Sequence, residues 1–194
     1  MAFCAEQGFP QMLAMATILR GWAAAEQGRT CEGITQMRHG LGSNPSGTGL
    51  GRPPVLALLA EAYGAIGQTE VGLAFLTEAL VLVHQTEERW CEAELYRLQG
   101  ELLLQPPFSD AQQGESCLQQ ALDIARHQQA KSLELRAAMS LSRLWQQQNK
   151  RAEARLLLAE VYNWFTEGFE TTDLREARAL LDMLESYERD AIRS

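Results

Sequence analysis

Residues 56–80 read LALLAEAYGAIGQTEVGLAFLTEAL, and this stretch predicts the fold. Its first half carries an apolar stripe at the spacing of one helical face, formed by Leu56, Leu59, Ala60 and Tyr63. Its second half carries another such stripe, formed by Gly72, Leu73, Leu76, Ala79 and Leu80. Gly67 lies between the two stripes, where glycine commonly ends a helix in a left-handed turn. Two helices joined by a tight turn predict an antiparallel hairpin.

The same layout recurs along the chain. Residues 138–162 repeat it with Asn149 in place of Gly67, because asparagine also tolerates the left-handed conformation. An earlier copy turns at Gly28, and a further copy lies between the second and the last. The second helices of the four copies close on residues that are 39, 42 and 40 positions apart, namely Leu41, Leu80, Leu122 and Tyr162. Four copies at a near-constant period indicate a repeat architecture.

The repeat divides the chain into four hairpins and one further helix. We predict an all-α fold in a single domain over residues 1–194, with hairpins at about 11–42, 53–85, 87–129 and 131–167. The stretch 43–54 is rich in Gly, Pro and Ser, so we predict a loop there. A last helix at about 172–191 combines an apolar face with a polar remainder. That combination is typical of a helix that caps a repeat array.

The small residues, aromatic residues and turn glycines of these copies resemble the tetratricopeptide repeat. Segments such as ILRGWAAAEQG (18–28) and LALLAEAYGAIGQ (56–68) are similar to the C-terminal repeat region of large bacterial signalling proteins, which join ATPase, cyclase or transcription-output domains to a helical tail. The resemblance covers nearly the whole chain. It implies a right-handed superhelical solenoid of about four long-helix repeats plus a capping helix. Gly33, Gly72 and Gly114 stand where the family more often has alanine, and they allow close approach of two helices.

Composition narrows the classes of function. The net charge is −8, whereas nucleic-acid binding draws on a basic face, so we exclude a nucleic-acid partner. No apolar run of membrane-spanning length occurs, and the first residues lack the layout of a signal peptide. The four cysteines form no CxxC pair and have no histidine at zinc-ligand spacing, so we predict no metal site. These patterns predict a cytoplasmic protein without cofactors and without a membrane segment.

The histidines do not suggest catalysis. His39, His84 and His127 follow the repeat period and fall near the ends of the second helices, where the helix dipole favours them. Without a histidine poised as a base, no nucleophile arrangement stands out. We therefore predict that the chain is not an enzyme and has no catalytic residue.

In the family that this sequence resembles, the first helices line a concave groove that binds partners. The positions that the resemblance assigns to this groove are Trp22, Glu61, Glu94, Arg97, Glu101, Arg136, Met139 and Arg143. Three of them, Glu94, Arg97 and Glu101, form a charge ladder at i, i+3 and i+7. Two interpretations of the ladder stay open. It is either a salt-bridge row that only supports its helix, or a strip whose arginine grips the carboxylates of a partner.

The favoured function is a non-catalytic scaffold that binds a peptide or protein, or a second copy of itself, through the groove. The alternative is a ligand-sensing regulatory domain coupled to an ATPase, cyclase or transcription-output domain. A deep apolar pocket lined by Trp22, Tyr63 and Met139 would favour that alternative. A hydrolase hidden among the carboxylates is a third interpretation. The lysine and asparagine clamp of chaperone-binding members is not expected, because Lys131 and Lys150 are the only lysines.

Overall fold

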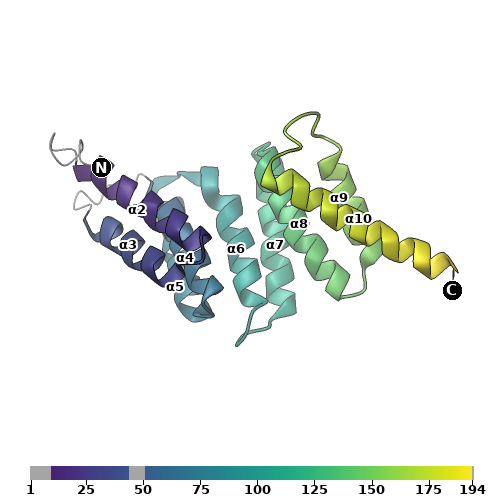
Figure 1. Ribbon diagram of the computed structural model, residues 1–194, viewed down its shortest axis with the longest axis horizontal. Coiled ribbons are helices and arrows are strands. Elements are labelled where there is room, and N and C mark those ends of the chain that lie inside the picture. Colours follow the sequence, from purple (N-terminus) through teal and green to yellow (C-terminus); the bar gives the residue numbers. More distant parts are fainter. Residues whose placement is uncertain (1–9, 44–50, 194) are drawn as a thin grey trace. The chain divides into compact units, whose positions relative to one another are not determined.

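The computed structural model describes residues 10–43 and 51–193 of the chain (Figure 1). Within these ranges the chain forms α-helices and one short 3-10 helix, and no strand occurs. The predicted all-α class is confirmed. The elements in order are α2 (Pro10–Glu26), α3 (Thr30–Gly42), α4 (Arg52–Ala65), α5 (Thr69–Thr86), η1 (Arg89–Cys91), α6 (Glu92–Leu103), α7 (Ala111–His127), α8 (Lys131–Gln147), α9 (Arg151–Tyr162) and α10 (Thr172–Arg193).

The chain divides into two compact units. The first comprises residues 1–91 and 105–108, and the second comprises residues 92–104 and 109–194. In the first unit α2 packs against α3 and α4 packs against α5, and α4 also contacts both helices of the preceding hairpin. In the second unit the hairpins are α6 with α7 and α8 with α9. There α8 contacts α6 and α7, and α10 contacts α8 and α9. Each later element therefore packs on the hairpin that precedes it in its unit.

Three hairpins turn on a residue with a left-handed backbone. Gly28, Gly67 and Asn149 have φ of 83°, 74° and 63°, as the repeat predicted. At each turn the amide of the next residue donates to a carbonyl five positions back, for example Arg29 to Ala24 at 2.9 Å. This is the Schellman arrangement that satisfies the last carbonyls of a helix. The connection between α7 and α8 uses the same turn with Gln129 at φ 55°.

In two of the hairpins, the two helices cross at glycines. A Cβ on Gly33 of α3 would meet the carbonyl oxygen of Gly21 on α2, and it would lie 2.9 Å from the Cβ of Ala25. In the second unit a Cβ on Gly100 of α6 would lie 2.9 Å from the carbonyl oxygen of Gly114 on α7. Real Cβ atoms do not approach a backbone so closely. Glycine is therefore required at these crossings, because the two helix backbones are in direct contact.

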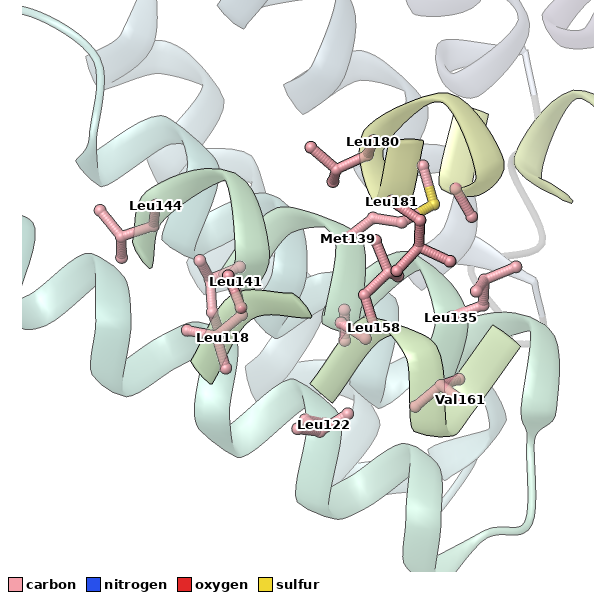
Figure 2. Close-up of a cluster of buried hydrophobic side chains, with 14 of the residues drawn as sticks. Leu118, Leu122, Leu135, Met139, Leu141, Leu144, Leu158, Val161, Leu180 and Leu181 are labelled. Atoms are coloured by element: carbon pink, nitrogen blue, oxygen red, sulfur yellow. The ribbon is translucent and has the colours of Figure 1, made fainter. Parts of the chain in front are cut away.

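Each unit has its own apolar core. The core of the first unit includes Ile18, Met37, Leu59 and Tyr63, and the ring of Phe75 stacks on Tyr63 with centroids 5.6 Å apart. The core of the second unit is larger and draws on every helix from α7 to α10. Figure 2 shows its side chains converging between those helices. The last helix contributes five buried residues to it, namely Leu174, Ala177, Leu180, Leu181 and Leu184, so α10 covers the final hairpin as a cap would.

One predicted boundary needs revision, and one tryptophan lies at the surface. The predicted loop 43–54 lies mostly outside the described residues, and α4 already begins at Arg52 because prolines are tolerated in the first turn of a helix. Trp164, which follows α9, is 58% exposed, with its ring edge-on to Phe165 and the Lys131 ammonium 5.6 Å from its centroid. A cation over an aromatic face is a favourable contact at the surface, so this tryptophan does not need burial.

Candidate functional site

The charge ladder of α6 is built around one nearly buried arginine. Arg97 is 8% exposed. Its Nε and Nη2 donate to the two carboxylate oxygens of Glu94 at 2.9 and 2.8 Å, and its Nη1 lies 2.7 Å from Oε1 of Glu101. A two-pronged contact of this kind fixes the plane of the guanidinium as well as its position. The ladder is thus a rigid intrahelical row in which the arginine is already committed to two carboxylates.

The ladder continues onto α8. Arg136 Nη1 lies 3.2 Å from Oε1 of Glu94, and the hydroxyl of Ser140 donates to Oε1 of Glu101 at 2.6 Å. Arg136 is far more exposed than Arg97, with 44% of its side chain accessible against 10% for Arg97. The polar row therefore links α6 and α8, and on α8 Arg136 faces water whereas Ser140 is buried.

A third helix completes the row. Arg136 Nε lies 2.8 Å from Oδ2 of Asp173, and Arg143 Nη2 lies 3.0 Å from Oε2 of Glu176. Both carboxylates belong to the first turns of α10. We call the surface formed by Glu94, Arg97, Glu101, Arg136, Ser140, Arg143, Asp173 and Glu176 the ionic face. It joins the first helices of two successive hairpins to the cap.

The electrostatics of the ionic face favour the charged states. Burial alone would raise the pKa of Glu94, but the hydrogen bonds and charge of Arg97, together with Arg136, lower it below its usual value. Burial alone would lower the pKa of Arg136, but the hydrogen bond that it donates to Asp173 and the negative charges of Glu94 and Asp173 leave the pKa raised. Both groups are thus held ionised by their partners, and the face presents fixed charges of alternating sign.

The structure does not gather all eight predicted groove residues. Glu94, Arg97, Glu101, Arg136 and Arg143 lie together on the ionic face. The prediction for Met139 is wrong: it is 3% exposed inside the core of the second unit, because its position on α8 points between the helices. Trp22 and Glu61 belong to the first unit, where both are exposed on α2 and α4.

The sequence interpretation missed three members of the ionic face. Asp173 and Glu176 belong to the last helix, which was predicted only as a cap, and Ser140 lies outside the positions that the resemblance assigned to the groove. The signal that could have found the two carboxylates is their distance along the chain. They follow Arg136 and Arg143 by 37 and 33 residues, which is close to one repeat. Residues one repeat apart on first helices face each other when hairpins stack.

A second polar cluster has a structural task. Glu115 on α7 accepts hydrogen bonds from the indole N–H of Trp145 at 2.7 Å and from the amide of Gln148 at 3.0 Å. The Trp145 hydrogen bond lowers the pKa of Glu115, and Gln148 and Lys150 add to this effect against its burial. The rest of the Trp145 ring is partly buried and packs on the core of the second unit. This carboxylate ties the turn after α8 to α7.

Other features of the described residues are less specific. A cavity of about 490 Å³ lies beside α10 and is lined by Tyr162, Phe169, Leu174, Arg175, Arg178, Ala179 and Asp182. Over the ranges 10–43 and 51–193, no helix is long and apolar enough to cross a membrane. The same ranges hold no cluster of His, Cys, Asp and Glu suited to a metal ion.

Comparison with solved structures identifies the type of fold. No protein-family model and no curated protein matches the sequence. Among solved structures, the putative kinesin light chain repeats of Podosopora anserina, described as TPR-like, match at a TM-score of 0.64 and 16% identity, over 95% of this chain and 98% of theirs. The apo form of RapI matches at 0.67 and 12% identity, over 90% of this chain and 48% of RapI. MamA matches at 0.50 and 17% identity, over 90% of this chain and 97% of MamA.

The chain has a tetratricopeptide-like repeat fold. At these identities the likeness concerns the fold alone, because one architecture supports many functions. The tetratricopeptide-like hairpins explain why the ionic face is continuous within the second unit. First helices of successive hairpins lie next to each other, so their equivalent positions form one surface.

Proposed function

We propose that the chain is a non-catalytic module that binds a protein or peptide partner through the ionic face. The observation that carries the proposal is the row of ion pairs across α6, α8 and α10, whose outer members remain accessible. Arg136, Arg143 and Glu176 keep 44, 45 and 54% of their side chains exposed, while Glu94 and Arg97 behind them are nearly enclosed. A surface already held in place loses little entropy when a partner docks.

The chemistry of the face suggests how a partner is recognised. The pair between Arg143 and Glu176 is exposed, and such pairs contribute only about 0–1 kcal/mol to stability. A partner carboxylate can therefore replace Glu176 on the Arg143 guanidinium at little cost, and a basic partner group can bind the released Glu176. Arg97 is not available in this way, because Glu94 and Glu101 occupy its donors. We therefore expect the side chains of the ionic face on α8 and α10, rather than those on α6, to contact the partner.

The wider setting is part of the same proposal. We infer a cytoplasmic role in bacterial signalling or regulation, from the resemblance to the repeat regions of large bacterial signalling proteins. The sensor alternative required a pocket lined by Trp22, Tyr63 and Met139. Tyr63 and Met139 are buried in the cores of their units, which gives that alternative no support.

The test starts from capture of partners from the native host with the wild-type chain, identified by mass spectrometry. The purified partner is then titrated against Arg143→Glu and Arg136→Glu variants, with Arg29→Glu as the matched control. Arg29 is also an exposed arginine paired with one carboxylate, Glu32, but it lies in the first unit, between α2 and α3. We expect each of the two variants on the face to weaken binding at least about tenfold, because an attraction to a partner carboxylate becomes a repulsion. Wild-type affinity in both would show that the ionic face is only structural.

A further inference from the structure

The first helix of the first unit carries an exposed apolar row. Met12, Met15, Leu19 and Trp22 on α2 are 39 to 63% exposed. Their spacing of three, four and three residues places them along one face of the helix. Beside this row lie Ala16 and Ala23, whose small side chains let another helix come close. We call these four large side chains the apolar row. Contiguous apolar surface of this kind marks a place of interaction.

The repeat itself shows what normally covers this position. The residue on α4 equivalent to Leu19 is Leu58, which is partly buried against the core of the first unit. The equivalent residue on α8 is Ser140, which is 5% exposed and bonded to Glu101 on the preceding first helix. The equivalent positions of α4 and α8 are thus at least partly covered. On α2 the described residues place no helix over this position.

The last helix provides a contrast. The side of α10 that faces away from the core carries Arg175, Arg178 and Asp182, all exposed, with Arg178 Nη2 lying 3.0 Å from Asp182 Oδ1. A face with charged side chains is stable in water without a partner. The apolar row of α2 has no such protection. It is therefore suited to being covered by another helix.

The spacing of the row is the same in both directions along the helix. A reversed second copy presents the identical three, four, three order, so Met12 meets Trp22 of the other copy and Met15 meets Leu19. Alternating steps of three and four residues also form the seam of paired helices. A two-fold contact needs one surface that is complementary to itself, and this row satisfies that requirement.

We propose that two copies of this chain associate through antiparallel packing of α2 on α2, with the two-fold axis near Thr17. Charge does not oppose the contact. Helix α2 carries one arginine, Arg20, and one glutamate, Glu26, so it is neutral in a chain with a net charge of −8. The pairing is independent of the ionic face, so the proposed function and this inference can fail separately.

The expected strength follows from the size of the contact. Stable interfaces bury roughly 1,200–2,000 Å², and one helix of 17 residues packed on its copy provides less than that. The association is therefore reversible and rises with concentration. In sedimentation velocity, the average mass of the wild type rises from 21.6 kDa toward twice that value between about 1 and 100 µM. A wild-type chain that keeps its single-copy mass up to about 100 µM overturns the proposal.

The first variant tests the apolar row. Leu19→Glu places a charge at the centre of the contact, and we expect it to raise the dissociation constant at least about tenfold. Leu156→Glu is the matched control, because Leu156 on α9 is also an exposed leucine, at 62%, and lies outside the row. Circular dichroism of both variants checks that the helices remain folded. Equal weakening by both variants contradicts the assignment to α2.

The second pair of variants tests the direction of the helices. Ala16→Cys and Ala23→Cys are made with Cys4 and Cys31 changed to serine, and each is oxidised at a concentration where the wild type associates. In the antiparallel pair the two copies of residue 16 are offset by about 3 Å along the helix, and those of residue 23 by about 18 Å. A disulfide needs Cα atoms within about 7 Å. We expect cross-linking of the Ala16→Cys variant alone. Cross-linking of both variants, or of neither, overturns the antiparallel arrangement.

Discussion

The first and fourth hairpins share one framework and differ in what they present. Counterparts in α2/α3 and α8/α9 are 121 residues apart along the chain. By this relation the helices of the first hairpin cross at Gly21 and Gly33, and those of the fourth cross at Ser142 and Ala154. The turn residues correspond as well, with Gly28 at φ 83° and Asn149 at φ 63°. The backbone plan is the same in both hairpins.

Their outward positions carry opposite chemistry. Met15 and Trp22 of the apolar row correspond to Arg136 and Arg143 of the ionic face. The repeat thus determines where a side chain points, and the residue type at that point determines what can bind there. Within one short chain, equivalent positions provide an apolar contact on α2 and fixed charges on α8. The difference in chemistry suits the two surfaces to different partners.

The largest expected effect on stability comes from replacing Gly33 at the crossing of the first hairpin by alanine, the residue that its counterpart Ala154 has in the fourth hairpin. Gly33→Ala adds a methyl group that meets the Gly21 carbonyl and lies 2.9 Å from the Ala25 Cβ. The two backbones must separate, and we expect a loss of about 2–3 kcal/mol in the free energy of unfolding of the first unit. Urea unfolding followed by circular dichroism measures it. Gly42→Ala is the control, because no atom lies within 4 Å of the added Cβ and helix propensity favours alanine. Equal stability of both variants would mean that the hairpins tolerate the same crossing.

A smaller effect is expected from giving the ionic face the chemistry of the apolar row. Arg136→Met keeps an unbranched apolar stem but removes the guanidinium, and with it the contacts at 3.2 Å to Glu94 and 2.8 Å to Asp173. We expect the second unit to lose about 1 kcal/mol, since the pair is part of a network but half exposed. Arg29→Met, which removes one exposed pair with Glu32, should change stability by less than about 0.5 kcal/mol. Hydrogen exchange of α6 and α10 amides reports the difference. An unchanged exchange rate in Arg136→Met would contradict the linking role.

The smallest expected effect is a dependence of the stability of the second unit on pH. The pKa of Glu94 is lower in the folded chain than in the unfolded chain, so its contribution to stability is complete above the usual carboxyl pKa of 4.5. As pH falls below that value through the lowered pKa, the folded state must take up a proton and the contribution is lost. The same sign holds for Glu115. We therefore expect the second unit to lose stability below about pH 4.5.

The Arg136→Met variant sharpens the pH experiment. Because Arg136 helps to lower the pKa of Glu94, its removal brings the folded and unfolded pKa values closer together. Urea unfolding of the wild type and the variant from pH 7 to pH 3 should give curves that converge at acid pH. If the two curves keep a constant separation over this range, the Glu94 charge does not depend on Arg136.

Much of the fold could be predicted because its causes are local. The stripe of Leu56, Leu59 and Tyr63 needs only the helical period, and Gly67 needs only the conformational freedom of glycine. The ionic face was predicted in part, since Glu94, Arg97 and Glu101 lie on one helix. Arg136 and Arg143 were assigned through the family resemblance. Their partners Asp173 and Glu176 were missed, because contacts between helices depend on packing that no local pattern records.

By itself, the sequence determined that this chain is a series of helical hairpins with a capping helix, since period, turn residues and apolar stripes act over a few residues. Only the tertiary structure decided that Met139 is core and that Arg97 is already saturated by its neighbours. It also decided that the apolar row of α2 stays exposed whereas Ser140 on α8 is covered. Exposure depends on which helix lies across each position, and that follows from the stacking of distant segments.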